Sequence, residues 1–337
     1  MELYRSLRIA ALHQRALLAL LGLAAATLAG PARAAPSCVG RSAHDAEARC
    51  ESLDVGGRER TFRLYVPTRV APAAPLLVVL HGGGGGGGGM EVLTAHGFNR
   101  RADESGAIIV YPDGIGRGWN DGRHDLRSQA VKEQIDDVGF LRALVAELER
   151  RYPIDRARVF VTGMSNGGMM TLRLACEARD VFKGFVAVAA SLGEDIAAGC
   201  NAEGIGRLAL IDGTADPIVP WDGGTVAILG AARGRVIGAR ASFAFFSDAA
   251  KCRAEHQDPP LDRVADDGTQ LTLHRALECL DGADVRLYQV DGGGHAWPGG
   301  LRYLGERLIG KVSRELDATD ETWRFLGLAA GTSAGPV

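Results

Sequence analysis

Apolar residues occur along the chain in short continuous runs that are bounded by turn residues. The runs are PLLVVL at 75–80, AIIVY at 107–111, VFVT at 159–162, FVAVAA at 185–190 and LALI at 208–211. Continuous apolar character predicts strands that are buried on both faces of a sheet. The segment TFRLYV at 61–66 instead alternates apolar and polar positions. That alternation predicts an antiparallel strand near the start of the sheet.

Helical periodicity fills the intervals between these strands. Within residues 137–151, apolar side chains such as Phe140 and Leu144 recur at helical spacing. We expect two further helices, over 166–178 and over about 317–326. Because strands and helices alternate, the sequence predicts an α/β fold: a mostly parallel, twisted sheet with helices on both faces, in a single domain.

The first 34 residues have the features of a targeting segment. Three arginines precede an apolar run at 16–29, and Ala-Arg-Ala follows at 32–34. The run is shorter than the roughly 20 residues that a membrane-spanning helix needs, so a membrane anchor is the less favoured alternative. We expect a secretory signal peptide over 1–34, export to the periplasm or the medium, and no membrane attachment after cleavage.

Charge and composition narrow the class of protein. Hydrophobic residues make up 46% and charged residues 23% of the chain, which is typical of a folded soluble domain. Lys and Arg number 38 against 41 Asp and Glu, so no basic excess is present to neutralise a phosphate backbone. Nucleic acid is therefore not an expected partner, and the oligomeric state is not readable.

The chain contains six cysteines: Cys38, Cys50, Cys176, Cys200, Cys252 and Cys279. No two of them form a C-x-x-C pair, and an even set in an exported protein predicts disulfides. Sequence alone leaves their connectivity open. Pairing neighbours along the chain would close three compact loops: 38 with 50, 176 with 200 and 252 with 279.

Two segments are of low complexity. Eight consecutive glycines, Gly82–Gly89, directly follow a predicted buried strand. We expect them to form a loop at the carboxyl edge of the sheet, where α/β proteins place their functional sites. The terminal stretch 329–337 has no apolar period and is predicted to be a disordered tail. The folded domain is therefore expected to span 35–328.

The motif G-x-S-x-G occurs twice, at 163–167 and at 331–335. The first copy follows a predicted strand and opens a predicted helix, which is the context of a nucleophile elbow, whereas the second has neither neighbour. Small residues at such an elbow let the helix and the strand approach closely. Ser165 is therefore the candidate nucleophile, and Ser333 is assigned to the tail.

A serine hydroxyl needs a general base, and the base needs an acid that orients it. In chains with a nucleophile elbow, the acid and then the histidine follow the serine. Asp216 comes after the last buried run and is the candidate acid, with Asp212 as the alternative. His295 lies in a glycine-rich turn, and we predict it to be the base in preference to His256 and His274.

Two backbone amides are expected to stabilise the oxyanion of an acyl-transfer intermediate. One belongs to Asn166, directly after the serine, and the other to Gly83 in the glycine run. The sequence contains no H-E-x-x-H pattern, cysteine–histidine cluster, P-loop or dinucleotide fingerprint. Neither a metal nor an organic cofactor is implied.

Eight short motifs are spread over the predicted domain. They are LHGGGG at 80–85, YPDG at 111–114, GWND at 118–121, DDVGF at 136–140, GMSNGGMM at 163–170, GTADPIVPWDGG at 213–224, GGGHAWPGG at 292–300 and DATDETWRF at 317–325. Together they resemble the secreted esterases that include polyhydroxybutyrate depolymerases and feruloyl esterases. The resemblance implies the α/β-hydrolase fold, with Ser165 as nucleophile, Asp216 as acid and His295 as base. The glycine run is longer than the family loop, and Asp212 stands where a histidine is common.

The sequence therefore predicts a secreted serine carboxylesterase that forms an acyl-enzyme on Ser165. Feruloyl or other hydroxycinnamoyl esters and poly- or oligo-3-hydroxybutyrate are the expected substrates, with soluble esters favoured because no linker or second module is visible. Trp119, Trp221 and Trp297 are expected to line an acyl or aromatic pocket, or alternatively to plug loops over the core. An acyltransferase with the same triad and a binding protein on a hydrolase scaffold are the alternative functions.

Overall fold

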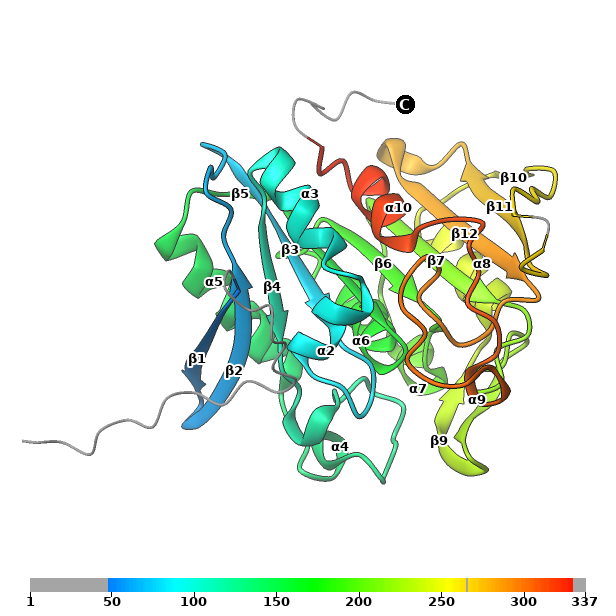
Figure 1. The fold of residues 1–337 in the computed structure, drawn as a ribbon, viewed down its shortest axis with the longest axis horizontal. Coiled ribbons are helices and arrows are strands. Elements are labelled where there is room, and N and C mark those ends of the chain that lie inside the picture. Colours follow the sequence, from blue (N-terminus) through cyan, green and yellow to red (C-terminus); the bar gives the residue numbers. More distant parts are fainter. Residues whose placement is uncertain (1–47, 265, 330–337) are drawn as a thin grey trace, which may run out of the picture. The chain divides into compact units, whose positions relative to one another are not determined.

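A ten-stranded sheet forms the centre of the structure, a computed structural model that describes residues 48–264 and 266–329 (Figure 1). The strands stand in the order β1-β2-β4-β3-β5-β6-β7-β12-β11-β10. Their bounds are β1 Arg49–Val55, β2 Arg58–Tyr65, β3 Ala74–Leu80, β4 Ile108–Pro112, β5 Ile154–Met164, β6 Gly184–Val188, β7 Arg207–Gly213, β10 Ala254–Gln257, β11 Gln270–Leu277 and β12 Asp284–Asp291. A separate hairpin pairs β8 (Gly224–Ile228) with β9 (Ala231–Val236).

The central strands of the sheet are parallel and its edges are antiparallel. Strands β4, β3, β5, β6, β7 and β12 run in one direction. Strands β1 and β2 at one edge, and β11 and β10 at the other, pair in antiparallel fashion. The predicted α/β fold is confirmed, and the alternating segment 61–66 lies mostly in the antiparallel strand β2. Because the parallel strands end at one edge, the loops after β3, β5, β7 and β12 converge there.

Helices cover both faces of the sheet (Figure 1). Their bounds are α2 Gly87–Leu93, α3 Gly97–Ser105, α4 Gln129–Lys132, α5 Asp137–Arg151, α6 Asn166–Glu177, α7 Glu194–Gly199, α8 Ala239–Ala249, α9 Glu306–Ile309 and α10 Ala318–Phe325, with short 3-10 turns at Ile115–Arg117 and Leu280–Gly282. Leu76 and Val78 of β3 join the core beneath α5, α6 and α8, whereas Leu77 and Val79 join the core beneath α2, α3 and α10. Burial of both faces explains why the central strands are continuous apolar runs. None of the helices in this described part is long and apolar enough to cross a membrane.

The glycine run is partly helical, so the prediction of a loop over all of Gly82–Gly89 is wrong for its last three residues. Gly87 to Gly89 form the first turn of α2. The Gly87 amide donates a hydrogen bond to Asp113 Oδ1 at 2.8 Å, and a Cβ on Gly87 would lie 2.3 Å from the Tyr111 carbonyl oxygen. Tertiary contacts therefore override the poor helix propensity of glycine, since only glycine fits against β4 at this point.

The sequence did not predict the short or exposed strands. Strands β1 and β10 lie at the sheet edges and have mostly exposed or half-buried side chains, so no apolar run marks them. The β8–β9 hairpin likewise has mostly exposed or half-buried side chains. The signal peptide expected at 1–34 and the tail from 330 onwards, with Ser333, lie outside the described residues.

Two bridges of the neighbour pairing are present among the described residues. They join Cys176 to Cys200 and Cys252 to Cys279. Cys50 is also disulfide-bonded, but its expected partner, Cys38, lies outside the described residues. No free cysteine occurs in the part of the chain that the structure describes, in agreement with the expectation of disulfides.

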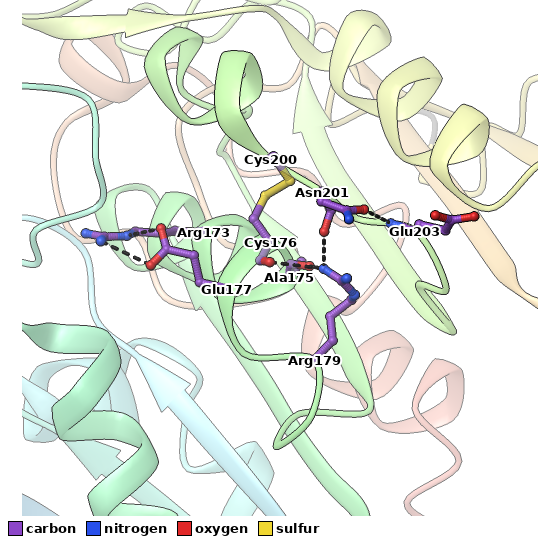
Figure 2. The surroundings of a disulfide bond; sticks show 8 residues. All are labelled: Arg173, Ala175, Cys176, Glu177, Arg179, Cys200, Asn201 and Glu203. Atoms are coloured by element: carbon purple, nitrogen blue, oxygen red, sulfur yellow. Dashed lines mark hydrogen bonds and ion pairs between the residues drawn. A yellow bond between two sulfur atoms is a disulfide. The ribbon is translucent and has the colours of Figure 1, made fainter.

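The Cys176–Cys200 bridge joins the end of α6 to the segment that follows α7. Figure 2 shows that Arg179 reinforces the same junction, donating to the carbonyl oxygens of Ala175, Cys176 and Asn201. Helix α6 begins directly after Ser165, so this covalent tie anchors the far end of the helix that follows the candidate nucleophile.

Removing this bridge is expected to lower the free energy of unfolding. The bridged residues are 24 positions apart, and a loop of that size restricts the unfolded chain enough to contribute about 3 kcal/mol. We expect this loss for the double variant Cys176→Ser/Cys200→Ser, measured by urea unfolding without reductant. The neighbouring Glu177→Gln change removes only an exposed ion pair with Arg173 and should cost about 0.5 kcal/mol or less. Identical midpoints for the double variant and the wild type would contradict the prediction.

Candidate active site

Ser165 lies at the sharp turn between β5 and α6. Its backbone has φ 55° and ψ −122°, a conformation that costs energy for any residue with a side chain and is typical of functional turns. A Cβ on Gly163 would lie 2.6 Å from the Gly167 backbone, and a Cβ on Gly167 would lie 2.5 Å from the carbonyl oxygens of Leu80 and His81. Close packing of α6 against β5 and β3 therefore requires both glycines of the motif, as the elbow interpretation predicts.

The structure brings Ser165, His295 and Asp216 into one hydrogen-bonded chain. His295 Nε2 lies 2.9 Å from Ser165 Oγ, and His295 Nδ1 lies 2.7 Å from Asp216 Oδ2. The carboxylate can only accept, so we assign the ring hydrogen to Nδ1, which leaves Nε2 free to accept the serine proton. The His295 and Asp216 side chains are only 4% and 2% exposed. This arrangement can activate the hydroxyl as a nucleophile.

Backbone amides orient the acid of this chain. Asp216 Oδ1 accepts hydrogen bonds from the amides of Ile218 at 2.7 Å and Val219 at 2.8 Å. These two bonds fix the rotation of the carboxylate, so that Oδ2 points at the imidazole. Asp216, and not the alternative Asp212, is therefore the carboxylate that contacts His295.

The turn that carries His295 is held by the segment 301–309. The His295 amide donates to the Ile309 carbonyl oxygen, and the His295 carbonyl oxygen accepts the Tyr303 hydroxyl at 3.0 Å. A Cβ on Gly294 would lie 2.1 Å from the Ile309 oxygen, so the glycine before the histidine is required by the same contact. Sequence analysis missed Tyr303, because no motif or apolar period marks it.

The two predicted oxyanion donors lie beside the elbow. A Cβ on Gly82 would come within 3.5 Å of the Ser165 side chain, and one on Gly83 within 3.7 Å of the Asn166 side chain. Asn166 is the first residue of α6, where a backbone N–H has no acceptor within the helix. The Gly83 amide likewise has no backbone acceptor among the described residues. Both amides are thus available to a substrate oxygen.

His81 fixes the peptide that carries the Gly83 amide. Its Nε2 accepts the Gly114 amide at 2.9 Å, so we assign the hydrogen to Nδ1, which donates to the Gly82 carbonyl oxygen at 2.8 Å. Burial lowers the pKa of the imidazole and favours this neutral form. Because a peptide unit is planar, holding the Gly82 carbonyl also sets the direction of the Gly83 N–H.

The Asn166 side chain ties the elbow to the loop after β4. Its Oδ1 accepts the Trp119 amide at 2.7 Å, and its Nδ2 donates to the Trp119 carbonyl oxygen at 3.0 Å and to Asp121 Oδ2 at 2.6 Å. Asp121 in turn forms a buried ion pair with Arg123 at 2.7 Å. The sequence analysis gave Asp121 and Arg123 no role. Asp121 could have been found, because it is the last residue of the GWND motif.

Trp119 and Trp297 are fully buried, which corrects the prediction that they line a substrate pocket. The Trp119 indole donates to the His81 carbonyl oxygen at 2.9 Å, and the Trp297 indole donates to Thr319 Oγ1 at 3.0 Å. Both rings support loops over the core, which was the alternative interpretation. Trp221 is partly exposed and stays a candidate for substrate contact.

Sequence comparison finds a relative that spans most of this chain. A protein of Nocardia uniformis subsp. tsuyamanensis, named "Putative esterase NocK", is 33% identical over 320 residues, which cover 88% of this chain and 90% of that protein. The chain belongs to this family of α/β-hydrolase esterases. A family model described as the prolyl oligopeptidase family also matches residues 100–193 of the esterase.

A further relative of the esterase matches a shorter stretch, and a solved structure shares its fold. Feruloyl esterase B of Piromyces equi is 26% identical over 58% of this chain but only 35% of its own length, so the chain spans about a third of that relative. The solved structure of acetyl xylan esterase from Aspergillus awamori is 15% identical and has a TM-score of 0.51, covering 83% of this chain and 100% of that one. At this identity the structural likeness supports the fold alone.

The esterase also holds a second acid near its Ser–His–Asp chain. Asp212 at the end of β7 is buried, and its Oδ1 accepts the Ala190 amide at 2.7 Å. Its Oδ2 has no hydrogen-bond partner among the described residues. Burial, and to a lesser degree the charge of Asp216, raises the pKa of the Asp212 carboxyl well above its usual range, against the effect of the Ala190 hydrogen bond.

The raised pKa of Asp212 predicts how stability changes with pH. In the unfolded chain this carboxyl ionises near its usual pKa of about 4, whereas folding resists its ionisation. The contribution of Asp212 to the stability of the wild type therefore falls as the pH rises from about 4 towards the folded pKa. Asp212→Asn cannot ionise, so its free energy of unfolding relative to wild type should increase over this range.

Urea unfolding at several pH values from 4 to 8 measures this difference. Any cost of burying the Asn side chain is independent of pH. It lowers the free energy of unfolding of Asp212→Asn by the same amount at every pH and leaves the trend unchanged. Asp222→Asn, at an exposed carboxyl, is the matched control and should follow the wild type. A difference between Asp212→Asn and wild type that does not change with pH would refute the prediction.

Proposed function

We propose that the protein is a secreted serine carboxylesterase that works through an acyl-enzyme on Ser165. The observation that carries the proposal is the chain of contacts from Ser165 Oγ through His295 to Asp216, built on a strained turn. Membership of the esterase family supports the same chemistry. The disulfides support export to an oxidising compartment.

The first half-reaction transfers the acyl group to the enzyme. Ser165 Oγ attacks the ester carbonyl carbon while its proton passes to His295 Nε2, and the Gly83 and Asn166 amides donate to the oxygen that becomes negative. Each such donor contributes about 3 kcal/mol to the stability of the intermediate. The intermediate then collapses, and the alcohol leaves with the proton from His295. Asp216 accepts the Nδ1–H throughout and stabilises the imidazolium.

The second half-reaction hydrolyses the acyl-enzyme. A water molecule gives a proton to His295 Nε2 as its oxygen attacks the acyl carbon, and the same amides hold the oxyanion. Collapse breaks the bond between the acyl carbon and Ser165 Oγ, which takes the proton back from His295. The carboxylic acid departs, and the enzyme returns to its starting state.

Hydroxycinnamoyl esters such as feruloyl esters, and oligomers or polymers of 3-hydroxybutyrate, are the substrates that we propose. The motifs shared with feruloyl esterases and polyhydroxybutyrate depolymerases support both classes. Trp221 follows the Asp216 loop and has exposed surface, so it is the tryptophan available to contact an acyl or aromatic group.

Trapping the covalent intermediate tests the proposed function. Wild type mixed with an activated aryl ester and quenched in acid should show the mass of one acyl group on Ser165, and Ser165→Ala should show none. Rates on feruloyl, short-chain and hydroxybutyrate esters then rank the substrates. An added alcohol separates hydrolase from acyltransferase, because an acyltransferase would form mainly the new ester. Turnover without any adduct in the wild type and unchanged turnover in Ser165→Ala would reject the mechanism.

A further inference from the structure

The β8–β9 hairpin lies outside the ten-stranded sheet and follows the loop that carries Asp216. The Ala227 amide of β8 donates to the Ile218 carbonyl oxygen at 3.1 Å. The same planar peptide unit carries the Val219 amide, which donates to Asp216 Oδ1 at 2.8 Å. The hairpin therefore fixes the direction of a peptide that orients the acid.

Arg123, in the loop after β4, holds the other strand of the hairpin. Its Nη1 donates to the Arg233 carbonyl oxygen of β9 at 2.8 Å. Gly234 has a φ of +85°, and a Cβ there would lie 2.3 Å from the Arg123 carbonyl oxygen, so the two backbones meet where only glycine fits. The Arg123 side chain is only 5% exposed. A buried guanidinium therefore joins the hairpin to the loop after β4.

The rest of the same guanidinium faces the nucleophile elbow. Nε and Nη2 of Arg123 donate to Asp121 Oδ2 at 2.9 and 2.7 Å. That oxygen also accepts the Asn166 Nδ2 hydrogen bond at 2.6 Å. Because both charges of the pair are buried, each is costly without the other. Arg123 thus reaches the elbow on one side, through Asp121, and the hairpin on the other.

The nucleophile and the acid come from different elements, and His295 must reach both of them. Ser165 lies between β5 and α6, whereas Asp216 follows β7. His295 lies 2.9 Å from the serine oxygen and 2.7 Å from the carboxylate. A carboxylate that turns away would release the imidazole from the tautomer that can accept the serine proton. A link between the elbow and the hairpin keeps the three side chains aligned.

We propose that Arg123 is a positioning residue that acts through the β8–β9 hairpin and orients the Asp216 carboxylate relative to the elbow. The inference rests on the proposed esterase function. Arg123 acts by geometry, since Asp121 already neutralises its charge. The planar fork presents its donors at fixed angles and so spans Asp121 and the Arg233 carbonyl, which a lysine ammonium cannot reproduce.

Arg123→Lys tests this role, because it keeps a positive charge beside Asp121 and removes the fork. The variant should lower kcat on a soluble aryl ester about tenfold, the size of effect expected for coupled neighbours. Its KM should stay within about twofold of wild type, because the orientation of the acid affects the chemical step and not ester binding. Steady-state kinetics measures both values, and thermal unfolding verifies that the variant is folded.

Combining Arg123→Lys with Asp216→Asn separates positioning from a merely structural role. If Arg123 acts through the Asp216 carboxylate, its replacement costs nothing once that carboxylate is gone. In Asp216→Asn the backbone amides hold the side chain in the rotation that favours the wrong tautomer, so a looser hold lets the carboxamide oxygen turn towards the ring. The kcat of the combined variant should therefore equal or exceed that of Asp216→Asn alone.

Gly234→Ala disturbs the hairpin side of the link and leaves the Arg123 side chain unchanged. The added methyl group would meet the Arg123 carbonyl oxygen, so the hairpin has to shift. This variant should also lose kcat about tenfold, and the loss should again be absent when Asp216 is replaced by Asn. It decides the proposal if Arg123→Lys does not fold.

Arg63→Lys is the matched control. Arg63 Nε donates to Glu91 Oε2 at 2.9 Å, and both side chains are only 3% exposed. The control therefore makes the same change in an equally buried ion pair. Arg63 belongs to β2, which lies on the other side of β5 from β7 and the acid. Its kcat should stay within about twofold of wild type in both backgrounds.

Several results would overturn the positioning role. They are a wild-type kcat in Arg123→Lys, the same fold loss of kcat with and without Asp216→Asn, and an equal loss in the Arg63→Lys control. A change confined to KM would assign Arg123 to ester binding instead. A wild type that turns over no ester would reject the proposed function and this role with it. Wild-type turnover that Arg123→Lys leaves unchanged would reject the role of Arg123 alone.

Discussion

Ser165→Ala and His295→Ala should each lower kcat on a soluble aryl ester by about 10⁵-fold, because the nucleophile and the base act as a unit. Without His295, the Ser165 hydroxyl loses the acceptor that lies 2.9 Å from its oxygen. Without Ser165, the imidazole has no hydroxyl to activate. The kcat of the double variant should therefore lie within a fewfold of the kcat of either single variant. Steady-state kinetics measures all three values.

Ser333→Ala is the control for the pattern itself, since Ser333 occupies the second G-x-S-x-G match. It should keep wild-type turnover. Thermal unfolding of the Ser165→Ala variant should stay near that of wild type, so that lost activity is not lost fold. Equal losses of turnover in Ser165→Ala and Ser333→Ala, or full activity in Ser165→Ala, would contradict the assignment of Ser165 as the nucleophile.

Asp216→Asn should lower kcat by about 10⁴-fold, because an amide in place of the carboxylate favours the wrong tautomer of His295. The amides of Ile218 and Val219 will still hold Oδ1, which turns Nδ2, a donor, towards Nδ1 of the ring. The imidazole must then carry its hydrogen on Nε2, where the serine proton has to go. A full pH–rate profile measures the loss at every pH.

Asp212→Asn is the comparison that identifies the acid. Asp212 accepts the Ala190 amide and does not bond His295, so its kcat should stay within about tenfold of wild type, which corresponds to 1.4 kcal/mol. A larger loss for Asp212→Asn than for Asp216→Asn would move the role of the acid to position 212.

Features with local causes were predictable from the sequence. Helix α5 has the predicted bounds, and Asp136 fixes its start by accepting the Gly139 amide in the first turn. Ser165 was recognisable because an elbow needs only a strand, small residues and a helix in succession. Asp216 and His295 followed from chain order, and the structure places both side chains within hydrogen-bonding distance of their partners.

Features that depend on distant contacts were not predictable. Nothing local makes glycines helical. At the start of α2 the Gly87 amide donates to Asp113, and Tyr111 lies too close to Gly87 for any side chain. The burial of Trp119 depends on a distant contact, because its indole donates to the His81 carbonyl oxygen. Tyr303 gains its place from a bond to the His295 backbone, which no pattern in its own segment encodes.

Asn166 combines two groups that ordinary mutagenesis cannot treat separately. The backbone amide is present in every substitution except proline, so a library at position 166 alters only the side chain that bonds Trp119 and Asp121. Inactive members of that library would measure the alignment of the elbow with the neighbouring loop and would carry no information about the amide. Isolating the amide takes backbone chemistry: semisynthesis with an ester in place of the 165–166 peptide bond deletes the N–H and leaves the carboxamide where it is.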